Sequence, residues 1–268
     1  MTRVHVGPLE LDYALRGQGP PLLMINGFRR SRVVWLEPLL AALETHFQLI
    51  LFDNRGTGHS DQPQDGYSIE AFADDCAGLL AALGIARAHV FGVSMGGMIA
   101  QRVATRHPGK VHGLALGCTN CGKGSVPPDK RIWDLLRLTP GPGLDPREIA
   151  RRQEEAYVTD AFQAANRPLL DQLFALVSEH PTPLHAVRGH MAAIDAFDGC
   201  GDLGRIAAPT LVITGAEDRL IPAENSRRIA AALPHATLNL LPEAAHFFWI
   251  EKPHETAQAL VAHLAPLH

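Results

Sequence analysis

Short apolar runs alternate with helix-period segments along most of this 268-residue chain, and that alternation restricts the fold more than any other feature. It is typical of a mostly parallel sheet with helices on both faces. Predicted strands are Leu9–Leu15, Leu22–Asn26, Phe47–Asp53, Ala88–Val93, Val111–Gly117, Thr210–Thr214 and Thr237–Leu241. Predicted helices between them are Val33–Glu44, Ser68–Leu83, Met95–His107, Ala223–Leu233 and Pro253–Leu264. The strands that flank Gly7-Pro8 are expected to add an antiparallel edge.

The alternation is interrupted once, over about residues 125–205, where no convincing strand is predicted. The predicted helices of this part are Arg147–Val158, Arg167–Ser178 and Leu184–Ala196. Because the alternation resumes at Pro209, a helical insertion within one α/β sheet explains the pattern better than two independent domains. We therefore expect a core of residues 1–124 and 206–268 with an inserted helical cap, residues 125–205.

The composition argues against several kinds of partner. With 46% hydrophobic residues, the chain can bury a large single core. Its net charge of −4 offers no basic face for nucleic acid, and no run of about 18 apolar residues predicts a membrane span. The first residues alternate and carry acids, unlike the apolar run of a signal peptide. We expect a cytoplasmic protein that binds neither nucleic acid nor a membrane.

Four cysteines, Cys76, Cys118, Cys121 and Cys200, are too few for a disulfide framework in a chain of this length. Cys118 and Cys121 form a C-x-x-C pair, but a zinc ribbon needs a second pair. A thioredoxin-like motif would open a helix, whereas glycines and prolines follow here. The favoured interpretation is reduced thiols at a strand end.

The segment Gly92-Val-Ser94-Met-Gly96 fits the pattern G-x-S-x-G between a predicted buried strand and a helix. A serine nucleophile at such a corner needs a tight turn, and flanking glycines let the neighbouring backbone approach closely. The alternative is a Gly-rich turn with a helix-capping serine. A dinucleotide-binding turn at residues 55–61 is disfavoured, because its third glycine is absent.

A serine hydroxyl needs a base that is oriented by an acid. Asp218 follows the strand Thr210–Thr214, and His246 follows the strand Thr237–Leu241. Both therefore lie at the same carboxyl edge of the sheet as Ser94, in the order serine, acid, histidine of elbow-type hydrolases. Glu217 is the competing acid, and Asp218 is preferred.

Together these motifs resemble the α/β-hydrolase fold superfamily over nearly the full chain. The stretches that carry the resemblance are Leu51–Ser60, Gly92–Gly97, Thr214–Asp218 and the loop at His246. The stretch from Asp53 through Gly97 resembles most the serine-nucleophile branch that contains carboxylesterases, 3-oxoadipate enol-lactonases and cofactor-free haloperoxidase-like perhydrolases. The resemblance implies a mostly parallel eight-stranded sheet flanked by helices, with a helical cap over the active site.

The resemblance also implies an oxyanion hole formed by the backbone N–H groups of Phe28 and Met95. Asn26 replaces the histidine that is common two residues before the first donor. Asp53 and Arg55 belong to a family motif whose role is structural. No metal ion or organic cofactor is required.

We therefore expect a serine hydrolase that cleaves a small carboxylic ester or lactone through an acyl-enzyme. The alternatives are a C–C bond hydrolase for meta-cleavage products or a haloperoxidase-like perhydrolase on the same triad, and a non-catalytic ligand receptor. An enol-lactonase would also need a cation for the substrate carboxylate. Candidates in the insertion are Arg131, Arg137, Arg151, Arg152, Arg167 and Arg188. The oligomeric state stays open, with a homo-oligomer among the alternatives.

Overall fold

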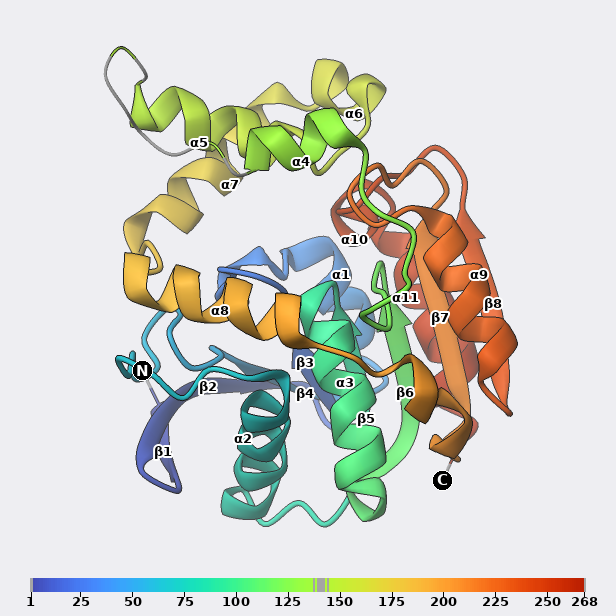
Figure 1. The fold of residues 1–268 in the computed structure, drawn as a ribbon. Helices are drawn as coiled ribbons and strands as arrows, with labels where there is room; N and C mark the ends of the chain where they lie inside the picture. The colour runs from blue at the N-terminus through green and yellow to red at the C-terminus, as the bar shows by residue number, and fades with distance from the viewer. Residues whose placement is uncertain (1, 137, 139–142, 144, 268) are drawn as a thin grey trace.

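The computed structural model describes residues 2–136, 138, 143 and 145–267, and its centre is one eight-stranded sheet (Figure 1). The strand order is β1-β2-β4-β3-β5-β6-β7-β8. The strands are β1 Thr2–Val6, β2 Leu9–Arg16, β3 Pro21–Ile25, β4 Gln48–Phe52, β5 Ala88–Val93, β6 Val111–Gly117, β7 Thr210–Gly215 and β8 Ala236–Leu241. β2 pairs antiparallel with β1 and β4, and the other neighbouring pairs are parallel. The predicted mostly parallel sheet with an antiparallel edge is confirmed.

Both faces of the sheet are covered by helices, so successive strand residues are buried in opposite layers. Leu22 and Met24 of β3 pack into one core cluster, and Leu23 and Ile25 pack into the other. The first layer contains α1 Glu37–Leu43, α10 Phe248–Glu251 and α11 Pro253–Leu264, and the second contains α2 Ile69–Ala82, α3 Met95–Arg106 and α9 Ala223–Ala232. Burial on both faces explains why the central strands β3 to β7 are largely continuous apolar runs.

The helix starts show where local sequence determined the fold. Ser68 precedes α2, and its Oγ accepts a hydrogen bond of 3.1 Å from the Ala71 N–H, as a capping residue should. The predicted helix Val33–Glu44 is instead divided into a 3-10 turn, Arg32–Val34, and α1. Pro38 lies in the first turn of α1, where its missing N–H has no helical partner to lose, and it favours a helix start there.

Among the described residues, five α-helices and the 3-10 helix Cys200–Arg205 lie between β6 and β7, and α4 to α7 gather at one end of the sheet (top of Figure 1). The five α-helices are α4 Lys130–Leu136, α5 Pro146–Glu155, α6 Asp160–Ala165, α7 Arg167–Glu179 and α8 Leu184–Ala196. Three of them match the predicted helices, whereas α4 and α6 were missed because one or two turns are too short to show a period. Within the described residues, no helix has both the length and the apolar character that crossing a membrane requires.

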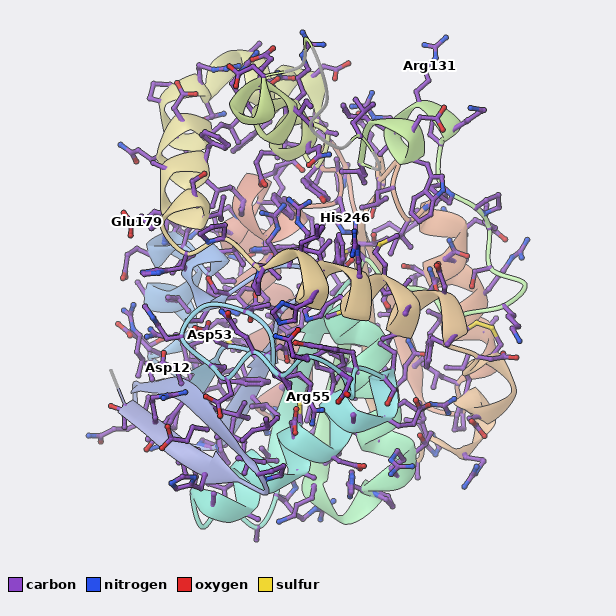
Figure 2. The ribbon with its side chains drawn as sticks, turned by 60° about the vertical axis from the view of Figure 1, so that its left-hand side comes forward. Asp12, Asp53, Arg55, Arg131, Glu179 and His246 are labelled. Carbon is purple, nitrogen blue, oxygen red and sulfur yellow. A yellow bond between two sulfur atoms is a disulfide. The ribbon has the colours of Figure 1, made fainter. Side chains whose placement is uncertain are left out.

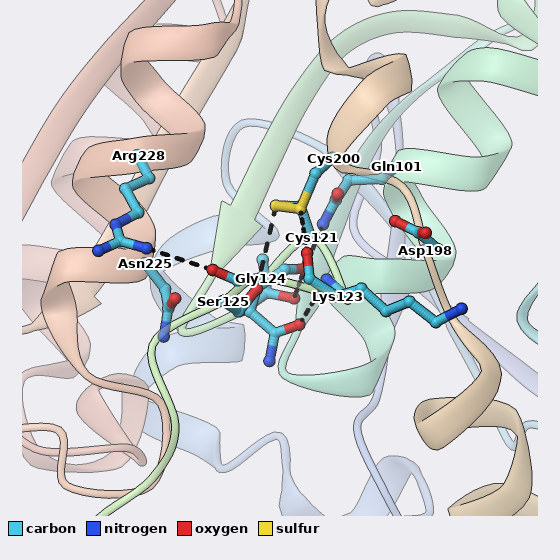
Figure 3. Close-up of a disulfide and its surroundings, with 12 residues drawn as sticks. Gln101, Cys121, Lys123, Gly124, Ser125, Asp198, Cys200, Asn225 and Arg228 are labelled. Atoms are coloured by element: carbon cyan, nitrogen blue, oxygen red, sulfur yellow. Dashed lines mark hydrogen bonds between the residues drawn. A yellow bond between two sulfur atoms is a disulfide. The ribbon is translucent and has the colours of Figure 1, made fainter.

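One expectation about the cysteines is wrong, because Cys121 and Cys200 form a disulfide (Figure 3). Their Cα atoms are 4.7 Å apart, although 79 positions separate them in sequence. The chain ends that enter and leave the inserted helices meet here, and the Gly199 N–H donates to the Cys121 carbonyl at 2.7 Å. Cys76 and Cys118 are free and buried. The C-x-x-C spacing groups Cys121 with Cys118, whereas its disulfide partner, Cys200, lies at the far end of the insertion.

The disulfide also bears on the expected compartment. Disulfides persist mainly in oxidising environments and are rare in cytosolic proteins. The cytoplasmic location inferred from the N-terminal residues therefore stays a prediction, and the disulfide weighs against it.

Reducing this disulfide, or replacing both Cys121 and Cys200 with serine, should lower the free energy of unfolding. Closing a loop of 79 residues removes chain entropy worth about 4 kcal/mol from the unfolded state. Urea unfolding with and without dithiothreitol would measure the loss, and the double variant should no longer respond to the reductant. Equal unfolding midpoints for oxidised and reduced wild type would contradict the disulfide.

Candidate active site

Ser94 occupies the corner between β5 and α3 with φ 58° and ψ −123°, a conformation that side-chain-bearing residues rarely adopt. The end of β6 holds this corner. The Ser94 N–H donates to the Gly117 carbonyl at 2.9 Å, and the Ser94 carbonyl accepts from Thr119 Oγ1 at 2.8 Å. Hydrogen bonds to the peptide groups before and after Ser94 fix the strained residue, so its hydroxyl has a defined position at the carboxyl edge of the sheet.

The glycines beside Ser94 allow three backbone segments to touch. A Cβ atom on Gly92 would lie 2.1 Å from the Gly96 carbonyl oxygen, and one on Gly96 would lie 2.2 Å from the Ile25 carbonyl oxygen. Both distances are far below van der Waals contact with backbone atoms, which cannot rotate away. The first turn of α3 therefore packs directly on β5 and on the end of β3.

Replacing Gly96 with alanine should destabilise the fold by about 1–3 kcal/mol, because its Cβ would overlap the Ile25 carbonyl. Gly109→Ala is the matched control, since a Cβ at Gly109 meets nothing within 4 Å. Urea unfolding of the two variants would compare them. A Gly96→Ala variant as stable as Gly109→Ala would show that the corner is not close-packed.

Asp218 and His246 come together at the same edge of the sheet. Asp218 Oδ2 lies 2.8 Å from His246 Nδ1, and both side chains are buried. Asp218 Oδ1 accepts from the N–H groups of Leu220 and Ile221, each at 2.9 Å, so the carboxylate is held on both oxygens. The competing acid, Glu217, is exposed. A carboxylate at Nδ1 places the imidazole proton there and leaves a lone pair on Nε2.

His246 Nε2 lies near Cys118, which was not among the site residues predicted from the sequence. Cys118 Sγ lies 4.0 Å from Nε2, and burial raises the pKa of this thiol well above its usual range, so it stays protonated. In the part of the chain that the structure describes, Ser94 Oγ makes no hydrogen bond to His246. Cys118 follows β6 at the carboxyl edge, and that position was the available signal. Cys118, Asp218 and His246 are also grouped closely enough to be potential metal ligands.

The loop that carries His246 is tied to the inserted helices by buried polar contacts. Glu251 accepts from the Ala245 N–H at 2.6 Å and from the Thr159 N–H at 2.8 Å, and burial raises its pKa. The ring of Phe247 stacks on Tyr157 with 4.5 Å between centroids. The position of the histidine therefore depends on the segment between α5 and α6, about 90 residues away in sequence.

The two expected N–H donors belong to Met95, which follows Ser94, and to Phe28, which follows a glycine that lies against Ser94. Both residues line one cavity together with Ser94 and His246, and its volume is about 150 Å³. Among the described residues, neither N–H group has a protein acceptor, so both can donate to a bound group. The side chain of Asn26 also lines the cavity, is fully buried, and has no hydrogen-bond partner on either amide atom.

The cationic side chains of the cavity are not those expected from the insertion. The described arginines among those candidates lie outside the cavity lining, and Arg131 extends away from the site (Figure 2). Arg137 lies outside the described residues. Arg29 and Arg30, from the loop after β3, line the cavity instead. Arg30 is buried in an ion pair of 2.7 Å with Glu154 of α5, a contact between residues 124 positions apart that no local pattern indicates.

His190 of α8 connects the insertion to two loops of the core. Its Nε2 lies 3.0 Å from the Arg55 carbonyl oxygen and so carries the proton, while Nδ1 lies 3.5 Å from the Arg29 N–H and accepts. The rings of Tyr67 and Phe72 pack around it. Burial lowers the pKa of His190 from 6.5 to about 4. The neutral imidazole is therefore the form that the fold requires.

This burial predicts that the free energy of unfolding falls as the pH drops from 6.5 to 4. The unfolded chain binds a proton at this histidine near pH 6.5, whereas the folded chain binds it only near pH 4. The difference corresponds to about 3 kcal/mol, fully present above pH 6.5. Urea unfolding at several pH values would measure this dependence. The free energy of unfolding should change less with pH in His190→Gln than in the control His254→Gln, whose histidine is exposed. An equal dependence on pH in the two variants would contradict a buried, neutral His190.

The comparisons with known proteins agree with this fold. The family model for the alpha/beta hydrolase fold matches residues 20–253, and the chain belongs to this family. The "Putative carbamate hydrolase RutD" of Caulobacter sp. (strain K31) is 31% identical over 252 residues, covering 93% of this chain and 90% of that protein.

Solved structures are similar over almost the whole chain. A hydrolase from Pseudomonas aeruginosa PA01 is 30% identical with a TM-score of 0.84, covering 98% of this chain and 97% of the other. The enol-lactonase from Burkholderia xenovorans LB400 is 28% identical with a TM-score of 0.84, covering 98% and 99%. The chain is therefore a hydrolase of the α/β fold, and the alternative of a non-catalytic receptor is set aside.

Proposed function

We propose that this hydrolase cleaves a small carboxylic ester or lactone through an acyl-enzyme on Ser94. The observation that carries the proposal is the Asp218–His246 pair at 2.8 Å, whose histidine lines the same cavity as a serine held at a strained corner. The pair supplies an oriented base, and the corner supplies an isolated hydroxyl. These are the parts that nucleophilic acyl transfer needs.

In the proposed reaction, Ser94 Oγ attacks the substrate carbonyl carbon while His246 Nε2 takes the hydroxyl proton. The bond from carbon to the leaving oxygen then breaks, and His246 returns the proton to that oxygen. A water molecule attacks the acyl-enzyme with His246 again as base, which releases the acid and restores Ser94. Asp218 keeps the imidazole in the required tautomer and stabilises its charged form.

The N–H groups of Phe28 and Met95 are proposed to bind the oxyanion that forms during each attack. Their lack of protein acceptors among the described residues supports this role. One such donor typically contributes about 3 kcal/mol to transition-state binding. Met95 also begins α3, so the helix N-terminus points at the developing charge.

We further propose that residues 125–205 act as a cap on a core of residues 1–124 and 206–268. Trp133, Leu136 and Ile194 of the insertion line the same cavity as Ser94, which supports the division. An apolar wall from the cap would exclude water during acyl transfer. A cavity of about 150 Å³ suits small substrates, since an engineered cavity of that size holds benzene.

A carbamate is the second candidate substrate, because RutD relatives are 31–32% identical over more than 90% of this chain. Attack on a carbamate carbonyl would use the same serine, base and oxyanion donors. Comparing kcat/KM for 4-nitrophenyl acetate and 4-nitrophenyl N-methylcarbamate would rank the two classes. A ring-fission diketone and a perhydrolysis assay would test the remaining chemistries predicted for this triad.

Ser94→Ala should lower kcat for 4-nitrophenyl acetate and butyrate at least about 10⁴-fold, because the nucleophile is lost. Asp218→Asn should lower it about 10⁴-fold by favouring the wrong imidazole tautomer. Ser178→Ala on the exposed face of α7 and Glu217→Gln are the matched controls, and both should keep wild-type rates. A Ser94→Ala variant with wild-type kcat would overturn the proposed function.

A further inference from the structure

The loop between β3 and α1, residues 26–30, has charge and polarity that the proposed reaction does not use. Described residues that line the cavity include two arginines, Arg29 and Arg30, and no aspartate or glutamate. The remaining lining is largely apolar, with side chains such as Met98, Trp133 and Leu220. Positive charge is therefore concentrated on the cavity wall that also contains Phe28, beside Ser94.

The two arginines differ in what neutralises them. The guanidinium of Arg30 is paired with Glu154 and lies 5.0 Å from the ring centroid of Tyr157, so it is a buried structural ion pair. Arg29 has no ion pair and no side-chain hydrogen bond among the described residues. Its guanidinium lies 5.6 Å from the ring centroid of Phe28, the residue proposed to donate its N–H to the oxyanion. Arg29 is thus an uncompensated cation next to the reacting position.

The backbone at Arg29 is fixed despite an unfavourable conformation. Its φ of 60° lies in the left-handed region, where glycine or asparagine would be less strained. The Arg29 carbonyl accepts from Thr182 Oγ1 at 3.2 Å, and its N–H points to His190 Nδ1 at 3.5 Å. Both partners belong to the inserted segment, so closing the insertion onto the core holds this arginine in place.

Asn26, at the other end of the loop, supplies a second and independent observation. Its side chain is fully buried and lines the cavity, yet both amide atoms have no hydrogen-bond partner among the described residues. Buried side-chain amides are nearly always hydrogen-bonded in native proteins. An unpaired amide that faces a cavity indicates a polar ligand group.

From these contacts we propose that residues 26–30 form a carboxylate-binding subsite, and that the substrate carries a carboxylate besides its scissile ester or lactone. Arg29 pairs with that carboxylate, and the amide of Asn26 donates beside it. A guanidinium suits a carboxylate because both groups are planar and can form two parallel hydrogen bonds. The inference rests on the proposed function, since it assumes that Ser94 attacks within this cavity.

Two pairs of esters test the subsite, and each pair compares a free carboxylate with its neutral methyl ester. Mono-4-nitrophenyl adipate and 4-nitrophenyl methyl adipate place the carboxylate on the acyl side. The anion of 4-acetoxybenzoic acid and its methyl ester place it on the leaving group. The measured quantity is the ratio of kcat/KM for the anionic ester to kcat/KM for the neutral ester. Wild type should prefer the anion at least about 10-fold in one pair, mainly through a lower KM.

Arg29→Gln should lower that ratio by about 10- to 100-fold, the usual effect of a hydrogen bond to a charged group. Arg29→Lys should recover part of it, because the charge is kept and the planar fork is lost. Asn26→Leu should lower the ratio several-fold. Arg29→Gly should lower it as much as the glutamine variant, with a Tm at or above wild type because the left-handed strain is relieved.

Arg131→Gln is the matched control, since Arg131 is exposed on α4 and extends away from the cavity (Figure 2). Its ratio should equal that of wild type. The subsite would be overturned if wild type showed no preference for the anionic ester in either pair. It would also be overturned if the folded Arg29→Gln and Arg29→Gly variants kept the wild-type ratio. Neither result would affect the proposed hydrolase function. If the Ser94→Ala variant hydrolysed these esters at the wild-type rate, the proposed function itself would be overturned.

Discussion

The close approach of three backbone segments at the β5–α3 corner is the constraint on which the site depends. Because Gly92 and Gly96 have no side chains, the first turn of α3 lies against β5 and against the carbonyl oxygen of Ile25. That packing holds Ser94 at a positive φ and places its hydroxyl at the carboxyl edge of the sheet. It also brings the first turn of α3, which begins at Met95, against the end of β3 and the loop that follows it.

The inserted helices contribute to the site through buried polar contacts with the core. Arg30 pairs with Glu154, Glu251 accepts from Thr159, and His190 bridges two core loops. A buried charge or carboxylate left without its partner is strongly destabilising, so these contacts restrict how the insertion can be seated. The position of His246 and the conformation of Arg29 both depend on how the insertion packs against the core.

The polar groups of the cavity divide into two sets. The first, with Ser94, His246 and two backbone N–H groups, matches the general requirements of acyl transfer and agrees with membership of the α/β-hydrolase family. The second, with the side chains of Arg29 and Asn26, has no part in the proposed steps, and among the described residues the Asn26 amide has no hydrogen-bond partner and Arg29 has no ion pair. Specificity within this family depends on such additional groups, because the same fold and nucleophile serve many substrates.

Local sequence determined most of the sheet and helices, and the positions of Ser94, Asp218 and His246 along it. Apolar periodicity, a capping residue such as Ser68 and the order of strand ends are properties of neighbouring residues, so they can be read without a structure. Only the tertiary structure decided that Cys121 pairs with Cys200, that Cys118 lies near His246, and that Arg29 faces the cavity while Arg131 does not. These outcomes depend on how the insertion packs against the core, and contacts between segments about 80 to 130 residues apart leave no periodic signal in either segment.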